Sequence, residues 1–272
     1  MDNNNNNNQN ENANQNENQN EMKNLEKKVD IQNKVIQDNQ KEIEKKEKEI
    51  EDKNKDIEDL RKTIAEMKPV FEEFIKKMEI KEKFPQFSNS KIIKDIKYIK
   101  KLQEWINDND FFYKMKKGFS AKRDGFDSKK WHEAVDGKIR TLVIIKTTDN
   151  FIFGGFTRVG WNSEFNNYRR DSQAFIFSLR NGKEHRTPQK FTIKEGEEKY
   201  AIYYNLVRGP WFGKGENNPD FYLMANLQPG FSNFGNSYNL PDGIEYGTDE
   251  ARNYLAGFYC EWIVDELETY FI

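Results

Sequence analysis

The chain has 272 residues, of which 46 are acidic and 44 are Lys or Arg, so the formal net charge is -2. This balance argues against a nucleic-acid-binding surface, which needs a net basic field. Hydrophobic residues make up 35% of the chain and charged residues 33%. That average is too polar for a single globule, because the polar residues gather in the first third of the chain.

Cysteine and histidine usage limits the chemistry further. The single cysteine, Cys260, allows neither an internal disulfide nor a zinc site built on cysteines, and His132 and His185 are the only histidines. We therefore expect no metal and no cofactor. No apolar run reaches the roughly 18 residues that a membrane helix needs. We expect no membrane insertion and a cytoplasmic location.

Residues 1–21 are almost entirely Asn, Gln and Glu. This segment has no apolar surface to bury, so we predict a disordered tail. Tracts rich in Asn and Gln can self-associate, but compositional bias alone also accounts for such a tract.

Residues 22–83 are rich in Lys and Glu, with apolar residues at regular intervals of seven. This spacing keeps one stripe of a helix facing a partner through a left-handed supercoil. We predict a coiled-coil helix that pairs two copies of the chain through residues 22–67, followed by a break and hinge from Pro69. The repeating residues are Met22, Val29, Ile36, Ile43, Ile50, Ile57 and Ile64.

The second stripe of this helix is weaker. If the repeating residues occupy heptad position a, Asp56 faces Arg61 favourably in a parallel dimer, while Glu42 faces Glu47 unfavourably. A solvated single helix that acts as a spacer therefore remains the alternative. Position d is polar in its middle, where it holds Gln32, Asn39, Lys46 and Lys53, and the hinge carries a short amphipathic patch of Phe71, Phe74, Ile75 and Met78.

From residue 87 onward the composition becomes globular. Ser90 is a candidate N-cap for a helix over residues 91–107. Short β-branched and aromatic runs separated by Gly and Asn turns then predict several strands and no βαβ rhythm, which favours a sandwich. The predicted strands are residues 141–146, 151–156, 174–179, 191–193, 200–204, 221–224 and 259–270.

A series of short motifs resembles the TLDc domain family over residues 87–272. Each motif alone is weak, but their order and spacing together are specific. They are Lys-Arg-Asp-Gly-Phe at 122–126, Trp131-His132, Asp136-Gly137, Thr-Leu-Val-Ile-Ile-Lys at 141–146, Phe-Gly-Gly-Phe at 153–156, Trp161, the run 171–179, Gly-Pro-Trp-Phe-Gly at 209–213, Ser-Asn-Phe-Gly at 232–235, Tyr-Leu-Ala-Gly at 254–257 and Glu-Thr-Tyr at 268–270.

The resemblance implies an α+β domain that is mainly β, a two-sheet antiparallel β-sandwich with flanking helices. Members are associated with protection against oxidative damage, and some bind the vacuolar proton-pumping ATPase. No established catalytic residues come with the family. Two positions depart from the family pattern: Val135 stands where a cysteine is frequent, and Trp211 stands where a small residue is more usual.

Five residues are candidates for contact with a protein partner: Arg123, Asp124, Trp211, Phe212 and Glu268. Asp124 is expected to accept backbone N–H groups in a charged turn. Trp211 and Phe212 are expected on an exposed Gly-rich loop, because Lys214 is not followed by the Ser or Thr of a phosphate-binding loop. Glu268 is expected on the surface together with Glu266, since both lie on one strand face.

The remaining residues that stand out have structural interpretations. Six glycines are expected to serve the backbone: Gly125, Gly154, Gly155, Gly209, Gly213 and Gly257. His132 is expected to be an ordinary core or surface histidine, since no nucleophile motif accompanies it. Cys260 is expected to be a packed thiol, because nothing basic adjoins it.

The leading hypothesis from the sequence is a non-catalytic interaction module, oligomerised or positioned by a coiled coil. By resemblance, its partner is the proton-pumping ATPase. One alternative is a hydrolase that uses carboxylates of the sandwich, which would need a Glu of raised pKa in a concave pocket. The other is a structural protein in which the coiled coil is the working part.

Overall fold

The computed structural model describes residues 5–181, 187–215 and 219–272, with side chains from residue 18 onward. The chain divides into two compact units, Met1–Phe71 and Glu72–Ile272.

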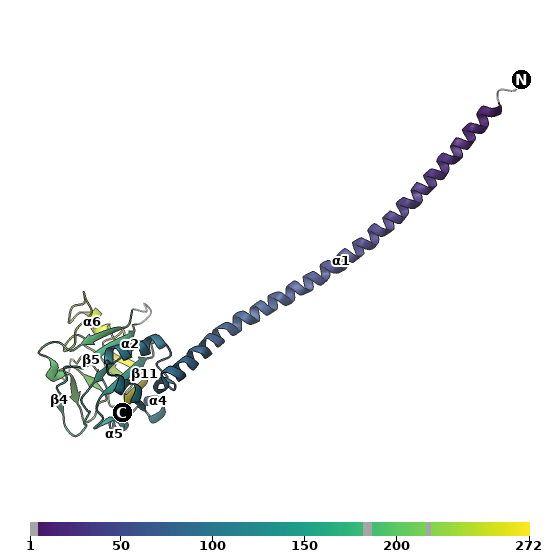
Figure 1. The fold of residues 1–272 in the computed structure, drawn as a ribbon. Helices are drawn as coiled ribbons and strands as arrows, with labels where there is room; N and C mark the ends of the chain where they lie inside the picture. The colour runs from purple at the N-terminus through teal and green to yellow at the C-terminus, as the bar shows by residue number, and fades with distance from the viewer. Residues whose placement is uncertain (1–4, 182–186, 216–218) are drawn as a thin grey trace. The chain divides into compact units, whose positions relative to one another are not determined.

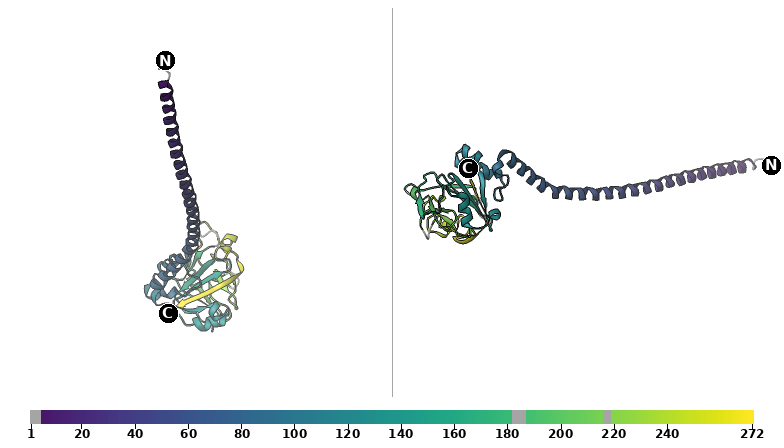
Figure 2. Two further views of the ribbon diagram at one scale, coloured as in Figure 1. Left: turned by 90° about the vertical axis from the view of Figure 1, so that its right-hand side faces the viewer. Right: turned by 90° about the horizontal axis from the view of Figure 1, so that it is seen from below.

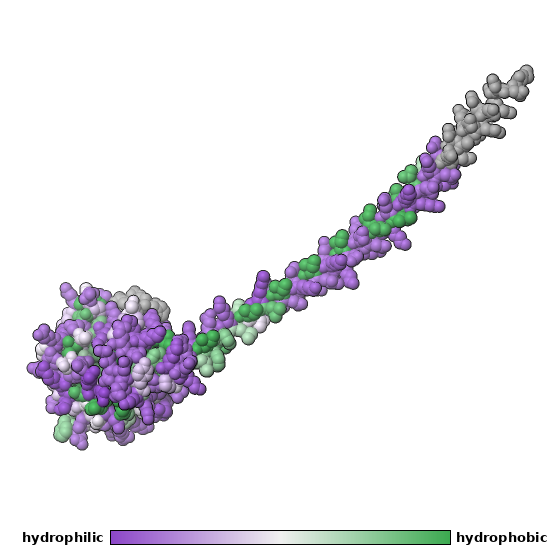
Figure 3. Space-filling view, in the orientation of Figure 1, coloured by the Kyte–Doolittle hydropathy of each residue, from purple (hydrophilic) through white to green (hydrophobic). Residues whose placement is uncertain are grey.

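A single helix, α1 (Asn5–Lys83), contains the predicted coiled-coil segment (Figure 1). It also includes residues 5–21, where the composition predicts disorder, while residues 1–4 lie outside the described residues. That stretch contains no Pro or Gly, and extending a formed helix adds one hydrogen bond per residue. Apolar residues recur along the exposed surface of α1 (Figure 3).

The predicted break at Pro69 is absent, because α1 continues through this residue to Lys83. A proline inside a helix removes one N–H donor and crowds the preceding turn. Here the residues around Pro69 are exposed, so water can satisfy the freed carbonyl. The helix end is held in the second unit, where Ile80 is buried in an apolar cluster.

The second unit is built on antiparallel strands that follow the order β4-β7-β8-β9-β10-β11-β2-β3-β5-β6. Strand β1 lies outside this order and pairs with β11. The long strand β11, yellow in the left view of Figure 2, joins the two halves. Its start pairs with β10, and its end pairs with β1 and β2. The strands are β1 (Lys116–Ser120), β2 (Thr141–Thr147), β3 (Ile152–Thr157), β4 (Asn167–Arg169), β5 (Phe175–Arg180), β6 (Gln189–Thr192), β7 (Ile202–Tyr204), β8 (Trp211–Phe212), β9 (Phe221–Leu223), β10 (Pro229–Phe231) and β11 (Cys260–Phe271).

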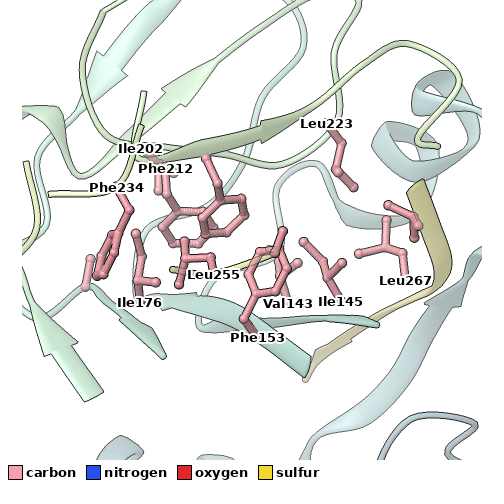
Figure 4. Close-up of a cluster of buried hydrophobic side chains, with 14 of the residues drawn as sticks. Val143, Ile145, Phe153, Ile176, Ile202, Phe212, Leu223, Phe234, Leu255 and Leu267 are labelled. Atoms are coloured by element: carbon pink, nitrogen blue, oxygen red, sulfur yellow. The ribbon is translucent and has the colours of Figure 1, made fainter. Parts of the chain in front are cut away.

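The inner core lies between the two halves of this sheet, as in a sandwich (Figure 4). Val143 and Phe153 come from one half, while Phe212 and Phe221 come from the other. The ring centroids of Phe153 and Phe221 lie 5.5 Å apart across the interface. The predicted α+β fold, mainly β and arranged as a sandwich, is therefore confirmed.

A second apolar layer lies between one sheet face and the helices. Side chains alternate along β2, so that Val143 and Ile145 enter the inner core while Leu142 and Ile144 enter this outer layer. The helical elements are η1 (Pro85–Phe87), α2 (Ile96–Ile106), α3 (Asn109–Lys114), α4 (Ala121–Asp124), α5 (Ser128–Val135), η3 (Glu198–Tyr200) and α6 (Asp249–Asn253). Buried residues of η1, α2 and α3 belong to the outer layer.

The first helix of this unit begins later than predicted. Asp95 caps α2 by accepting the Lys97 N–H at 2.9 Å, so the helix starts at Ile96 rather than at Lys91. Ser90 instead accepts the N–H groups of Ile92 and Ile93 in a turn. Ser and Asp share the capping preference, so the sequence alone could not choose between them.

Candidate functional site

Glu268 is fully buried, and the prediction that it lies on the surface is wrong. Its Oε2 accepts hydrogen bonds from the hydroxyls of Ser90, at 2.6 Å, and Tyr270, at 2.8 Å. Its Oε1 accepts from the Lys91 N–H at 2.7 Å and from the Lys117 ammonium at 2.8 Å. The side chain faces the outer apolar layer, where helices cover the sheet, and its four donors replace the lost water.

Glu266 lies on the same face of β11 and is also buried. Its Oε1 accepts N–H groups from Lys122, at 3.2 Å, and Leu267, at 3.1 Å, while its Oε2 has no hydrogen-bond partner. Burial raises the pKa of this carboxyl, and the charge of nearby Glu268 acts in the same direction. The two neighbouring carboxylates therefore differ, since Glu268 has a cationic partner and Glu266 has none within hydrogen-bond distance.

This difference predicts how Glu266→Gln behaves with pH. A carboxyl whose pKa is raised on folding holds its proton more tightly in the folded state, so its contribution to stability is lost as pH rises above 4.5 through the raised value. The free energy of unfolding of the variant relative to the wild type should therefore increase as pH rises from 4.5 through the raised pKa. Urea titration followed by tryptophan fluorescence measures it, and an unchanged or decreasing difference would contradict the assignment.

Arg123 and Asp124 form the charged turn that the motif predicts. Asp124 Oδ2 accepts the Ser120 N–H at 2.9 Å, and the Arg123 guanidinium donates to both carboxylate oxygens at 2.7 Å. The Arg123 guanidinium lowers the pKa of this carboxyl. Gly125 follows with φ +103°, a conformation that favours glycine. Arg123 remains exposed, so this turn stays a candidate partner contact.

Trp211 and Phe212 are buried in strand β8, and the prediction of an exposed aromatic pair is wrong. Trp211 stacks on Tyr222 with ring centroids 4.7 Å apart, and Phe212 stacks on Phe221 at 4.9 Å. Both partners come from β9, which pairs with β8. A two-residue strand is too short to show a periodic pattern, so the sequence offered no signal for it.

Glycines stand within β3 and next to β8 because neighbouring groups occupy the space that a larger side chain would fill. A Cβ at Gly155 would lie 2.5 Å from Cζ of Phe212, and one at Gly154 would lie 1.9 Å from the Val143 carbonyl oxygen. A Cβ at Gly209 would lie 2.3 Å from Leu227 Cδ2. Gly213 and Gly257 are also closely approached, and in addition they have positive φ, at +91° and +83°.

His132 is buried and has a partner on each ring nitrogen. Nδ1 lies 2.8 Å from Asp136 Oδ1, and Nε2 lies 2.9 Å from the Arg208 carbonyl oxygen. No serine or cysteine nucleophile contacts either nitrogen in the hydrogen bonds of the described residues, so this histidine holds α5 against the 205–208 segment. His185 lies outside the described residues.

Three apolar side chains are exposed together at the edge of the sheet: Phe165, Leu206 and Val207, which we call the 165–207 patch. They are 46–62% exposed. Strands β4 and β7 pair, and Asn166 Oδ1 accepts the Leu206 N–H at 3.2 Å, so the segments that carry the patch are adjacent. A cluster of exposed apolar side chains is typical of an interaction site.

A cavity of about 370 Å³ adjoins this patch, and its lining includes Leu206, His132, Asp136 and Ser163. The patch is held in place rather than loose, because the Ser128 hydroxyl donates to the Val207 carbonyl oxygen at 2.8 Å. A fixed apolar patch beside a partly polar hollow offers a partner both an apolar contact and hydrogen-bonding groups. No sequence pattern predicts the patch, because Phe165 is separated from Leu206 and Val207 by about 40 positions.

Two further cavities were found. One, of about 360 Å³, is lined by the C-terminal turns of α1 and by residues 87–94, including Lys77 and Lys94. The other, of about 240 Å³, is lined by Tyr259 and Cys260 among others. Cys260 is thus half-buried, and the thiol is less packed than we expected. Neither these cavities nor the one beside the 165–207 patch is lined by Glu266.

Within residues 5–181, 187–215 and 219–272, no group of three or more His, Cys, Asp or Glu side chains is placed to hold a metal ion. None of the helices in these ranges combines the length and apolar character that crossing a bilayer requires.

Comparison with known protein families matches the TLDc domain to residues 87–268, more than half of the 272 residues. The match includes β1 to β10 and most of β11, and its last residue is the buried Glu268. No curated protein matches the chain. With the motifs, the sandwich and this match in agreement, the chain belongs to the TLDc domain family.

Proposed function

We propose that this TLDc domain is a non-catalytic module that binds a protein partner through the 165–207 patch. The observation that carries the proposal is the patch itself, with three large apolar side chains exposed to water on paired and hydrogen-bonded segments. Leaving such a cluster exposed costs free energy that a partner would recover by covering it.

The arrangement of the buried carboxylates supports a binding role over hydrolysis. Glu268 spends all its acceptor positions on four internal donors. Glu266 has the raised pKa that an acid catalyst needs, but it lines none of the three cavities described above. A hydrolase that uses these strand carboxylates is therefore the weaker alternative.

The resemblance to the family suggests the partner and the pathway. We propose that the partner is a subunit of the vacuolar proton-pumping ATPase, and that the protein acts in the response to oxidative stress in the cytoplasm. Helix α1 would pair two copies through residues 22–67, which raises avidity for a target that offers repeated sites.

Substitution of the patch tests the binding role. The full-length chain with Phe165, Leu206 and Val207 changed to serine should recover proton-pump subunits from native lysate at least about tenfold less efficiently than the wild type. Because the three side chains are exposed, the variant should keep its fold, which its tryptophan fluorescence checks.

A matched control carries serine in place of Phe258 and Tyr259, which are as exposed as the patch residues and lie on the segment just before β11. It should recover the pump subunits as the wild type does. If both variants bind alike, the patch is not the contact. If the wild type recovers no pump subunit, the proposed partner is wrong.

A further inference from the structure

Helix α1 exposes five large apolar side chains within nine residues, next to the TLDc domain in sequence. Val70, Phe71, Phe74, Ile75 and Met78 are each 49–69% exposed. We call them the proximal stripe. Such a density of exposed apolar groups on one helix face marks an interface.

The proximal stripe continues the seven-residue repeat of the coiled-coil segment. Counting on from Ile64, Phe71 and Met78 fall at position a, and Phe74 follows Met67 at position d. Pro69 falls at position f, on the face away from the stripe, so it does not interrupt the repeat. The apolar seam therefore extends beyond residue 67 to Met78 within one helix.

This end of the seam is more apolar than its middle. From Ile64 to Met78, positions a and d hold only apolar residues. Between residues 32 and 53 position d is polar throughout, which weakens packing between helices. The densest part of the apolar seam therefore lies next to the TLDc domain in sequence.

Flanking positions indicate which partner fits. In a parallel, in-register pair, position g of one helix lies beside the next position e of the other. This places Val70 beside Ile75 and Lys77 beside Glu82, so an apolar residue meets an apolar one and opposite charges meet. In an antiparallel pair the stripe would meet the first heptads, which carry Glu26 and Lys28 at these positions.

The helix can use the proximal stripe without losing its own domain contact. Ile80 is buried in the outer apolar layer of its unit, whereas Met78, two residues earlier, lines the cavity beside residues 87–94 and is still about half exposed. The last turns thus hold the domain through Ile80, while part of the Met78 side chain remains open to solvent.

We propose that residues 70–82 form a parallel, in-register contact with a second copy of this chain, and that this contact provides most of the affinity of the dimer. The inference rests on the proposed pairing role of α1 and specifies its register and its strongest segment. Two TLDc domains would then be held at the same end of the pair.

Glutamine substitution of Phe71, Phe74 and Met78 in the full-length chain tests the contact. Glutamine preserves helix propensity while removing the apolar seam. Sedimentation equilibrium should give a dimer dissociation constant at least about 30-fold higher than that of the wild type. A wild type that is monomeric at about 50 μM would overturn the proposal.

The matched control places glutamine at Ile36, Ile43 and Ile50, three a positions in the middle of the seam. Its dissociation constant should rise less than that of the proximal variant. An equal or larger rise would show that the middle of the helix carries the dimer and would overturn the inference. Circular dichroism of both variants checks that the helix is retained.

Crosslinking tests the register independently. Met78→Cys in a Cys260→Ser background should form a disulfide-linked dimer on mild oxidation, because a positions face each other in a parallel pair. Lys76→Cys, at the outward f position, should remain uncrosslinked. A dimer that crosslinks through residue 76 and not through residue 78 would contradict the register.

The two proposals can fail separately. The 165–207 patch variant should remain dimeric in sedimentation, because none of its residues lies on α1. If the patch variant loses pump recovery but stays dimeric, the result concerns the patch alone. If the proximal-stripe variant loses the dimer in purified form, the result concerns the proximal stripe alone.

Discussion

Replacing Glu268 with alanine is expected to lower the free energy of unfolding of the TLDc domain by about 3–5 kcal/mol, the cost of leaving a buried ionic partner alone. The Lys117 ammonium, with 12% side-chain exposure, would lose its carboxylate and keep only the Asn89 carbonyl oxygen. The Ser90 hydroxyl and the Lys91 N–H would lose their acceptor as well. Urea denaturation followed by tryptophan fluorescence measures the change.

The probe suits this domain because all five tryptophans lie between residues 105 and 262. Glu245→Ala serves as the control, since Glu245 is exposed and its substitution should change the stability by less than about 0.5 kcal/mol. A double variant that also carries Lys117→Met should lose less stability than the sum of the losses from the two single variants. The double variant leaves neither the Lys117 ammonium nor the Glu268 carboxylate buried without its partner. Additive losses would contradict a coupled pair.

Glu268 also shows how far the sequence could be interpreted. Its period-two position on β11 correctly placed it on one face with Glu266. Two acids on one face of a strand usually indicate solvent, and of the four donors to Glu268 only the Tyr270 hydroxyl is near in sequence. Ser90 and Lys91 are about 180 residues away, and only the fold brings them to β11.

The strands also fall into two groups, those that the sequence predicted and those that it did not. The β-branched run of β2 and the apolar, aromatic run of β3 were predicted within about one residue, because side chains of these types favour strands. β4, β8 and β10 have two or three residues each, and only pairing with a neighbour makes them strands. The exposed 165–207 patch depends on β4 and on its partner β7, so it could not be found before the fold was known.

Replacing Phe212 with alanine is expected to cost about 3–5 kcal/mol of domain stability, the usual loss when a buried aromatic side chain is removed. Phe212 is fully buried in the inner core and stacks on Phe221 with ring centroids 4.9 Å apart. Its edge also lies over Gly155, where a Cβ would come within 2.5 Å of the ring. Phe212→Ala therefore removes the ring for which Gly155 leaves room.

A cycle of variants makes this packing testable. Gly155→Ala should destabilise the wild type, because all three atoms nearest to the added methyl belong to the Phe212 ring. In the Phe212→Ala background the same change should cost much less or add stability, since the methyl enters the cavity. Gly154→Ala is the matched control, because its added methyl would meet the Val143 carbonyl oxygen at 1.9 Å and stay costly in both backgrounds. If Phe212→Ala lowered the cost of Gly155→Ala and of Gly154→Ala by equal amounts, contact with the Phe212 ring would not be the reason for a glycine at position 155.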